Sequence, residues 1–509
     1  MAQEIETLNG ENVAQHLNSS ASTQLDLDGS NSGSNKLKVL YVMRSFAHFI
    51  YHETTIESLL SQNAEVQIAF DEKWSAGRPD SYITHWSESH GLLPYIFFPT
   101  RRDKWRDLIF QIRELSTFAS YLRRKGQSPF YLKRWERYLS PQIQKWLARP
   151  ILGRAFRLFL RSPIAKMLFS LIEKWTPAST EAIRFLEKIN PDIVIVSPTN
   201  LRYSEEVEIV KATKKLKVPS VIPVLTWDNL TTKGLIHVRP DLLLAWNQSH
   251  AKEAQAIHRV PLKNITITGS PFFDKWFDRQ FPNFDSSFYT RAGLKADMPF
   301  VTYLGSSANI APDESGLVTK LAQGFKSRPE MANWQILVRA HPANSRNFLK
   351  VTEDNVAFWP KPLEQKGELG LPETDESLMD FKFALSCSEC IIGINTSAMI
   401  EGIINDKPVI ALLLKAFAKT QEEASHFQHL LESDVLYLAT SVEQAFSIID
   451  QLKRGIDPKK PNRQNFVRSF VRANENSAGK IQADAILSFA NQMGKQKLNH
   501  QPRIAPSHP

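Results

Sequence analysis

Two series of short apolar runs, each alternating with amphipathic helical patterns, organise this sequence. The first series comprises residues 38–43, 66–70, 91–98, 192–196, 220–225, 242–246 and 265–268. The second comprises residues 300–304, 335–338, 356–359, 391–394, 409–413 and 435–438. Apolar runs separated by helical patterns are typical of parallel strands joined by helices. Because 509 residues are also too many for one hydrophobic core, we predict an α/β fold of two Rossmann-like domains that face each other across a cleft.

The alternation is interrupted once and is followed by a further helical pattern. It stops for residues 101–175, which we predict to be a basic helical insertion in an N-terminal domain of residues 36–270. The second series places the C-terminal domain at residues 271–464. A long helical pattern, strongest between Asn465 and Gln492, predicts a helix over residues 465–494 that packs back on the first domain, by analogy with two-domain enzymes of this shape.

Both ends of the chain lack apolar periodicity. Residues 1–35 are rich in Ser, Asn and Gly and contain five acidic residues but no Lys or Arg. We predict a disordered acidic tail there and a second disordered tail over residues 495–509.

Several function classes are disfavoured by the composition. The two cysteines, Cys387 and Cys390, provide no disulfide framework, and a single Cys-x-x-Cys favours a core role over a zinc or redox site. The N-terminus has no apolar segment typical of an export signal, and no uncharged apolar stretch approaches the ~18–20 residues that span a bilayer. We therefore expect a cytoplasmic protein.

Small and basic residues follow the first two runs of the second series. Gly305, Ser306 and Ser307 come directly after one run, and backbone N–H groups of small residues suit close approach to a phosphate. Arg339 and His341 end the next run, where a guanidinium can clamp a phosphate and an imidazole can add a donor. Taken singly, these patterns also fit a tight turn and a local ion pair.

The fourth run of the second series leads into the most informative segment. Asn395, Thr396 and Ser397 follow the run and can cap a helix that begins near Ala398. The free N–H groups and positive end of that helix would face a phosphate. Glu401, one turn into the helix, is suited to accept the two hydroxyls of a ribose. Since ligands bind at the carboxyl ends of parallel strands, all three groups predict one nucleotide site.

These motifs resemble the donor domain of the GT-B glycosyltransferases. The resemblance rests on Arg-x-His-Pro at 339–342 and on Thr-Ser-x-x-x-Glu followed by Lys-Pro-Val at 396–409, and it extends over roughly residues 36–490 without the insertion. Similar patterns occur in capsule- and teichoic-acid-type transferases and in non-hydrolysing UDP-N-acetylglucosamine 2-epimerases. The resemblance implies the GT-B fold, a phosphate role for Arg339 and His341, a diphosphate turn at Thr396 and Ser397, and a ribose acid at Glu401.

A polar loop in the first domain is the candidate acceptor site. It follows the run at 220–225 and combines one tryptophan with many hydrogen-bonding side chains. A Trp face can stack on a sugar ring, and Asp, Asn, Thr and Lys can bind hydroxyl groups. A well-packed turn is the alternative. The predicted acceptor-binding residues are Trp227, Asp228, Asn229, Thr232 and Lys233.

The candidate catalytic base is a histidine after the first run. Many inverting GT-B enzymes carry a histidine in this loop, and an unperturbed pKa of ~6.5 suits proton transfer near neutral pH. His48 is the first choice and His52, which we expect at a helix start, is the second. Many retaining members carry a further acid several residues before the position of Glu401; residues 390–394 contain none, which favours inversion.

The insertion holds the positive charge of the chain. Residues 101–175 contain 18 Lys and Arg against five Asp and Glu, a net charge of +13, whereas the whole chain carries +9. Around residues 151–161, helical geometry places arginines opposite Leu152, Phe156 and Phe159, as in helices that lie on anionic membranes. A helical subdomain packed internally is the second interpretation. Nucleic-acid binding is the third, and no accompanying motif supports it.

The sequence thus predicts a metal-independent glycosyltransferase without a cofactor. Its partners would be a nucleotide sugar and a cell-surface glycan or lipid-linked acceptor, with residues 101–175 on the inner face of the membrane. The enzyme alternatives on the same scaffold are a sugar-nucleotide epimerase and a CDP-glycerol-type glycerophosphotransferase. The non-enzyme alternative is an inactive membrane-associated scaffold.

Overall fold

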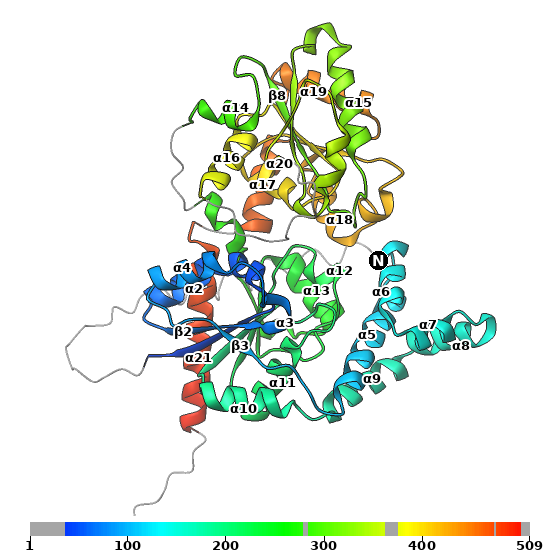
Figure 1. Ribbon diagram of the computed structural model, residues 1–509. Helices are drawn as coiled ribbons and strands as arrows, with labels where there is room; N and C mark the ends of the chain where they lie inside the picture. Colours follow the sequence, from blue (N-terminus) through cyan, green and yellow to red (C-terminus); the bar gives the residue numbers. More distant parts are fainter. Residues whose placement is uncertain (1–35, 278–283, 362–374, 473–474, 500–509) are drawn as a thin grey trace, which may run out of the picture. The chain divides into compact units, whose positions relative to one another are not determined.

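A computed structural model describes residues 36–277, 284–361, 375–472 and 475–499 (Figure 1). The tail predicted at residues 1–35, and residues 500–509 of the tail predicted at 495–509, lie outside the described residues. Residues 495–499 were expected to be disordered and instead end the last helix, Ala478–Asn499, because the helical pattern continues beyond the expected boundary. Two all-parallel sheets confirm the predicted α/β architecture of two Rossmann-like domains.

The first sheet has seven strands in the order β3-β2-β1-β4-β5-β6-β7. Its strands are β1 Lys38–Met43, β2 Glu65–Asp71, β3 Ile96–Phe98, β4 Ile193–Ser197, β5 Ser220–Pro223, β6 Leu242–Ala245 and β7 Ile265–Ile267. The helices are α2 Glu53–Ser61, α3 Glu72–Ser75, α4 Ser81–Ser89, α10 Thr180–Ile189, α11 Glu206–Leu216, α12 Asn229–Thr232 and α13 Gln248–His258. Buried runs such as Val39–Met43 explain the uninterrupted apolar pattern, because helices cover both faces of such a sheet.

The second sheet has six strands in the order β10-β9-β8-β11-β12-β13. Its strands are β8 Phe300–Leu304, β9 Gln335–Arg339, β10 Val356–Phe358, β11 Ile391–Gly393, β12 Val409–Leu412 and β13 Leu436–Ala439. The helices are α14 Ser287–Ala292, α15 Ser315–Lys326, α16 Asp375–Ser386, α17 Ala398–Ile404, α18 Ser425–Glu432, α19 Val442–Lys453 and α20 Lys460–Phe466. Every run of both predicted series contains a strand, although the run at 91–98 forms one only from Ile96.

Each sheet has one topological switch point, where the strand order reverses. In the first sheet it lies between β1 and β4, and in the second between β8 and β11. Loops that leave two adjacent strands in opposite directions open a crevice at their carboxyl ends, which is where open α/β sheets bind ligands. The segments after β8 and β11 are two of the three predicted for the nucleotide.

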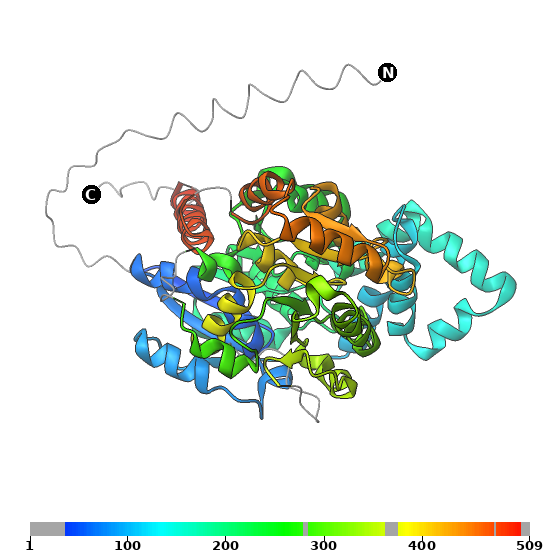
Figure 2. The ribbon, with the colours of Figure 1, turned by 90° about the horizontal axis from the view of Figure 1, so that it is seen from above.

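The insertion is helical. Its helices are α5 Arg106–Arg123, α6 Pro129–Tyr138, α7 Pro141–Leu147, α8 Pro150–Arg161 and α9 Pro163–Trp175. Helix α5 is largely buried, with Phe118 and Tyr121 in the core, whereas α8 and α9 extend outward (cyan in Figure 2). Among the described residues, no helix combines the length and the apolar character needed to cross a bilayer.

The C-terminal part differs from the single helix expected between Asn465 and Gln492. Helix α20 passes into a π-helical turn, Val467–Val471, and a separate helix, α21, covers Ala478–Asn499. The break has a physical reason: the Phe470 carbonyl accepts from Asn247 Nδ2 (2.9 Å) and the Val471 carbonyl accepts from the Ser270 amide (3.0 Å). These bonds hold the chain against the first domain, and α21 then runs beside α2 (Figure 1).

The carboxylate of Asp274 caps the start of α21. It accepts hydrogen bonds from the amides of Ala478 and Gly479, both at 2.8 Å, and from the Thr54 hydroxyl of α2 at 2.9 Å. Asp274 is buried. A single side chain therefore joins the segment between the two sheets, the first domain and the C-terminal helix.

Replacing Asp274 by Ala should lower the free energy of unfolding by about 2 kcal/mol, because a cap is lost and buried amides lose their acceptor. Urea unfolding measures the change. The control is Asp484→Ala, which removes exposed contacts of α21 to Gln62 and Lys480 and should cost about 0.5 kcal/mol or less. Equal effects of the two substitutions would contradict the role of Asp274.

Candidate functional site

The strand ends at the second switch point are in direct contact. The Asn395 amide, after β11, donates to the Ser306 hydroxyl, after β8, at 3.3 Å. Gly305 lies so close to the end of β9 that an added Cβ would stand 3.2 Å from Ala340 Cα and from the His341 nitrogen. The three predicted donor segments therefore meet at one edge of one sheet.

The backbone N–H groups of Gly305 and Ser306 do not have the exposed character that the sequence suggested. The Gly305 amide donates to the Arg339 carbonyl at 2.9 Å, and the Ser306 amide donates to Glu314 Oε2 at 2.8 Å. Burial raises the pKa of Glu314 to about 7. Both amides are used in hydrogen bonds that hold the loop in place, so they are not available to a phosphate.

Arg339 and His341 stand at the end of β9 and are half-buried. The Arg339 guanidinium lies 3.7 Å from the ring centre of Phe381 in α16, which fixes its plane. Burial, and then the charge of Arg339, lowers the pKa of His341. A fixed guanidinium beside a neutral imidazole suits an anionic ligand, since only the former carries charge.

The segment after β11 divides its side chains between structure and solvent. Asn395 is buried, and its amide group donates to the Thr420 carbonyl at 2.7 Å and lies 3.2 Å from His426 Nε2. The Thr396 hydroxyl accepts from the Ala398 amide at 3.4 Å, and Ser397 is exposed at the start of α17. Thr396 and Ser397 therefore form the open part of this strand end.

Glu401 lies in α17 and faces the segment that connects the two sheets. Its Oε1 accepts from the Trp276 indole at 3.1 Å and lies 3.2 Å from Lys275 Nζ. The carboxylate is buried. These two partners were missed by the sequence analysis, because nothing in the local pattern of residues 275–276 indicates a contact with a residue 125 positions away.

Asp228 and Lys233 are the partly exposed members of the predicted acceptor group. Although burial opposes it, the charges of Lys233 and His426 and the Thr226 and Thr232 hydroxyls hold the pKa of Asp228 well below its ordinary value. Lys233 Nζ lies 3.0 Å from Asp228 Oδ2. Asp228 is therefore an ionised hydrogen-bond acceptor at neutral pH.

The other three members of that group are buried. Trp227 packs edge-on against His426 with ring centres 4.6 Å apart, so its face is covered. Asn229 donates to Asn200 Oδ1 at 3.0 Å, and Thr232 donates to Asp228 Oδ2 at 2.7 Å. These contacts fix the loop.

His426 of α18 is a further residue that sequence analysis missed. It is buried between Trp227 of the first domain, Asn395 of the second and Tyr131 of the insertion, whose ring lies 6.3 Å away. Burial lowers the pKa of His426 to about 4. No local motif marks it, because its neighbours come from three distant parts of the chain.

The two candidate bases differ in environment. His48, in the 3-10 helix Phe46–Tyr51, is half-buried, and its Nδ1 lies 2.8 Å from the Ser45 hydroxyl. Burial, and then Arg44, lowers the pKa of His48 to about 4. His52 is fully buried, and among the described residues neither ring nitrogen has a hydrogen-bond partner. Burial lowers its pKa to about 3, so His52 is a neutral core residue.

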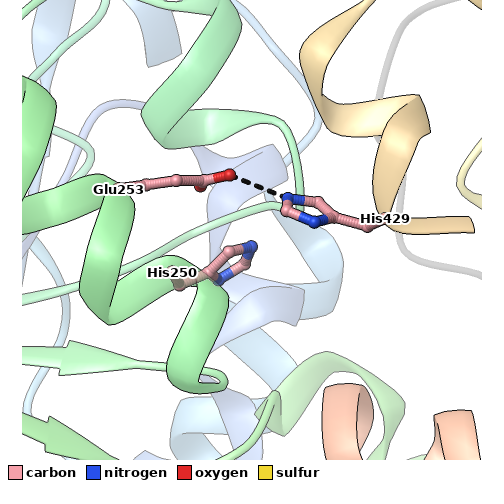
Figure 3. Close-up of side chains that lie close together, drawn as sticks. All are labelled: His250, Glu253 and His429. Atoms are coloured by element: carbon pink, nitrogen blue, oxygen red, sulfur yellow. Dashed lines mark hydrogen bonds and ion pairs between the residues drawn. The ribbon is translucent and has the colours of Figure 1, made fainter. Parts of the chain in front are cut away.

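One group of side chains among the described residues has the spacing of metal ligands (Figure 3). His250 and Glu253 of α13 and His429 of α18 place their ligand atoms within 4.8 Å of one another. His429 Nε2 lies 2.8 Å from Glu253 Oε1, and His250 Nε2 lies 3.3 Å from the Trp227 carbonyl. The contact between His429 and Glu253 joins α13 to α18, and imidazole and carboxylate groups at this spacing could hold a divalent cation.

Comparisons with known proteins bear on the fold. No protein-family model matches the sequence, and the search of curated proteins found no match. A UDP-N-acetylglucosamine 2-epimerase structure has a TM-score of 0.50 and 11% identity, covering 90% of this chain and 97% of that one. A Listeria monocytogenes structure named for the same activity has a TM-score of 0.50 and 12% identity, covering 93% and 100%.

A third structure, a glycosyltransferase from Rickettsia africae, has a TM-score of 0.47 and 10% identity and covers 91% of this chain and 99% of that one. With a TM-score below 0.5, it carries no argument by itself. At such identities the likeness concerns the fold alone. Together with the two parallel sheets, it shows that this chain has the GT-B fold that the sequence motifs implied.

Replacing His52 by Phe should make the protein less sensitive to acid. The pKa of His52 in the folded protein is about 3, which is below its value of ~6.5 in the unfolded chain. Burial of the neutral imidazole therefore contributes stability that is present above pH ~6.5 and is lost as the pH falls toward 3. Between pH 7.5 and pH 5, the free energy of unfolding should therefore fall by about 2 kcal/mol less in the variant than in the native protein. Urea unfolding at both pH values measures it. The exposed His85→Phe is the control, and equal pH dependence of the two variants would contradict a buried neutral His52.

Proposed function

We propose that this protein is a glycosyltransferase that moves a sugar from a nucleoside-diphosphate sugar to a cell-surface glycan or lipid-linked acceptor. The observation that supports this most is the convergence of three chemically suited strand ends at the switch point between β8 and β11. A crevice of this kind binds nucleotides in open α/β sheets generally.

In this proposal the donor diphosphate lies between the ends of β9 and β11. Arg339 and His341 contact it from one side, and Thr396 and Ser397 contact it from the other. Gly305, Ser306, Ser307 and Asn395 shape the floor by packing. The fixed charge of Arg339 and the hydroxyl groups of Thr396 and Ser397 stabilise the leaving diphosphate, so that transfer needs no metal.

Glu401 is the proposed ribose acid. Its carboxylate already contacts an indole and an ammonium, which orient it. A ribose would take the remaining acceptor positions of the two oxygens. This arrangement couples the donor to Lys275 and Trp276, the residues between the two sheets.

The acceptor is proposed to lie against Asp228 and Lys233, with Trp227, Asn229 and Thr232 holding their loop in place. His48 is the proposed base that removes the acceptor proton. With a pKa of about 4 it is unprotonated at neutral pH and can take a proton, although a base of this pKa is weaker than an unperturbed histidine.

Helices α8 and α9 are the proposed contact with an anionic membrane. They expose large apolar side chains, including Ile151 (82% exposed), Leu158, Ile164 and Trp175 (73%). Exposed cations such as Arg154 lie on the same helices. Apolar and basic side chains together are typical of helices that lie in the interface of an anionic bilayer. The acceptor would then be presented at that surface.

Epimerisation of a nucleotide sugar is the second candidate, since the two solved structures with a TM-score of 0.50 are named for it. The two reactions differ in what they require. An epimerase converts the nucleotide sugar alone, whereas a transferase releases the nucleoside diphosphate only when an acceptor hydroxyl is present.

The purified protein should first be screened by thermal shift with UDP, GDP, CDP and dTDP and their sugars. A true ligand at about 100 times its Kd stabilises by about 2.7 kcal/mol. Incubation of the best donor with membrane extract should then release nucleoside diphosphate, and His48→Ala should lose most of this turnover while its donor Kd stays unchanged. Appearance of an epimeric nucleotide sugar without any acceptor would contradict transfer and support the epimerase.

Glu401→Gln should weaken nucleotide binding at least tenfold, because hydrogen bonds to a charged carboxylate are worth about 1.5–3 kcal/mol. Isothermal titration with the best nucleotide measures Kd. Glu432→Gln, an exposed substitution in the same domain, is the matched control and should leave Kd unchanged. If both variants bind like the native protein, the donor site has been placed wrongly.

A further inference from the structure

A cavity of about 410 Å³ lies between the insertion and the first domain. Helices α5 and α9 form one side, and residues 235–239 with the end of α13 form the other. None of the proposed donor or acceptor residues lines it. Its basic lining residues are Arg123, Arg124, Lys166, Arg239 and Arg259.

The carboxylates near these five cations are bound to other residues. Glu253, whose charge acts on Arg124, lies 2.8 Å from His429 Nε2. The one carboxylate in the lining, Glu173, is bound to Arg113 through two hydrogen bonds (2.8 and 2.9 Å) and to Lys211 Nζ at 2.9 Å. None of the five basic side chains forms an ion pair with a carboxylate in the described part of the chain. Like charges gathered without a partner destabilise a fold unless an anion neutralises them.

The cations also act on one another. Burial, and then the charges of Arg259 and Arg124, lowers the pKa of Arg123. Burial lowers the pKa of Arg124 as well. The cavity histidines add no charge at neutral pH, since burial lowers the pKa of His237 and of His258 to about 3.

Arg124 leaves part of its hydrogen-bonding capacity unused. Its Nη1 donates to the Thr231 carbonyl at 2.6 Å, and the guanidinium lies 4.1 Å from the Tyr121 ring centre. Its Nε and Nη2 are buried and have no hydrogen-bond partner among the described residues. Two adjacent N–H groups of one guanidinium are the arrangement that binds two oxygens of a phosphate or carboxylate. The side chain is therefore held in place with its bidentate edge unoccupied.

Helix α9 presents different side chains to the cavity and to solvent. It contributes Lys166 and Ser170 to the lining. The exposed apolar residues Ile164 and Trp175 lie on the opposite face of the helix by its 3.6-residue periodicity. The exposed apolar surface of α9 is therefore no part of the cavity.

We propose that this cavity is a binding site for a phosphate group, carried by a lipid headgroup or by a soluble phosphate compound, and held by Arg124, Arg239 and Arg259. The phosphate oxygens accept from the unpartnered edge of Arg124, and the other two arginines neutralise the remaining charge. The site is separate from the proposed sugar transfer and needs no nucleotide.

The test uses the full-length protein and the double variant Arg239→Gln/Arg259→Gln. Both side chains are exposed, and the Arg259 side chain forms no hydrogen bond or ion pair with the described residues, so the fold should persist. The matched control, Arg184→Gln/Lys215→Gln, removes two exposed charges elsewhere. Probes are phosphatidylcholine vesicles containing phosphatidic acid, vesicles of equal surface charge containing a fatty acid instead, and soluble inorganic phosphate.

Phosphate recognition predicts that the native protein and the control bind phosphatidic acid vesicles, inorganic phosphate or both at least tenfold more tightly than the pocket variant does. Preference for phosphatidic acid vesicles over the fatty acid vesicles would identify a lipid headgroup as the ligand. Stabilisation by inorganic phosphate without that preference would identify a soluble phosphate compound. Equal binding of both phosphate probes by the native protein and the pocket variant would overturn the site, and equal binding of the two kinds of vesicle without stabilisation by inorganic phosphate would overturn phosphate recognition.

Discussion

The hydrogen bond from the Asn395 amide to the Ser306 hydroxyl joins the two strands at which the second sheet reverses its order. The bond requires β8 and β11 to end level with each other. It also requires the loop after β8 to lie close to β9, where a side chain at position 305 would crowd Ala340 and His341. The amides of that loop are used by Arg339 and Glu314, which makes the floor of the crevice rigid. What remains open for a ligand is the start of α17 and the end of β9.

The segment between the two sheets connects this site to the rest of the molecule. Asp274 caps α21 and contacts α2, and the next two residues, Lys275 and Trp276, contact Glu401. On the other side, His426 is buried among Trp227, Asn395 and Tyr131. Residues from the first domain, the second domain and the insertion therefore depend on one another around the proposed donor site. A ligand that moves Glu401 would act directly on the connecting segment.

The strands, and the positions of the candidate site residues at strand ends, could be predicted because they leave local signals. Buried parallel strands are continuous apolar runs, and the candidate residues follow these runs directly in the sequence. The contacts of Glu401 with Trp276, and of His426 with Trp227 and Tyr131, could not be predicted. These partners are over 100 positions apart in the sequence, and no local pattern indicates them. The prediction of one continuous C-terminal helix was wrong for the same reason, because hydrogen bonds from Asn247 and Ser270 interrupt a locally helical pattern. Trp227 illustrates a further limit: composition suggested an open stacking face, and packing against His426 covers it. The sequence showed only the net positive charge of the insertion. The basic cavity could not be predicted from it, because its arginines come together only in the fold.

The central claim is that a nucleoside diphosphate binds at the strand ends of the second sheet. Hydrogen–deuterium exchange of the native protein, with and without the nucleotide that stabilises it most, tests this directly. The account predicts slower exchange in the presence of the nucleotide for peptides that cover residues 394–401 and 338–342, with little change at residues 226–233. Protection confined to the first sheet, or none at a saturating nucleotide concentration, would contradict it.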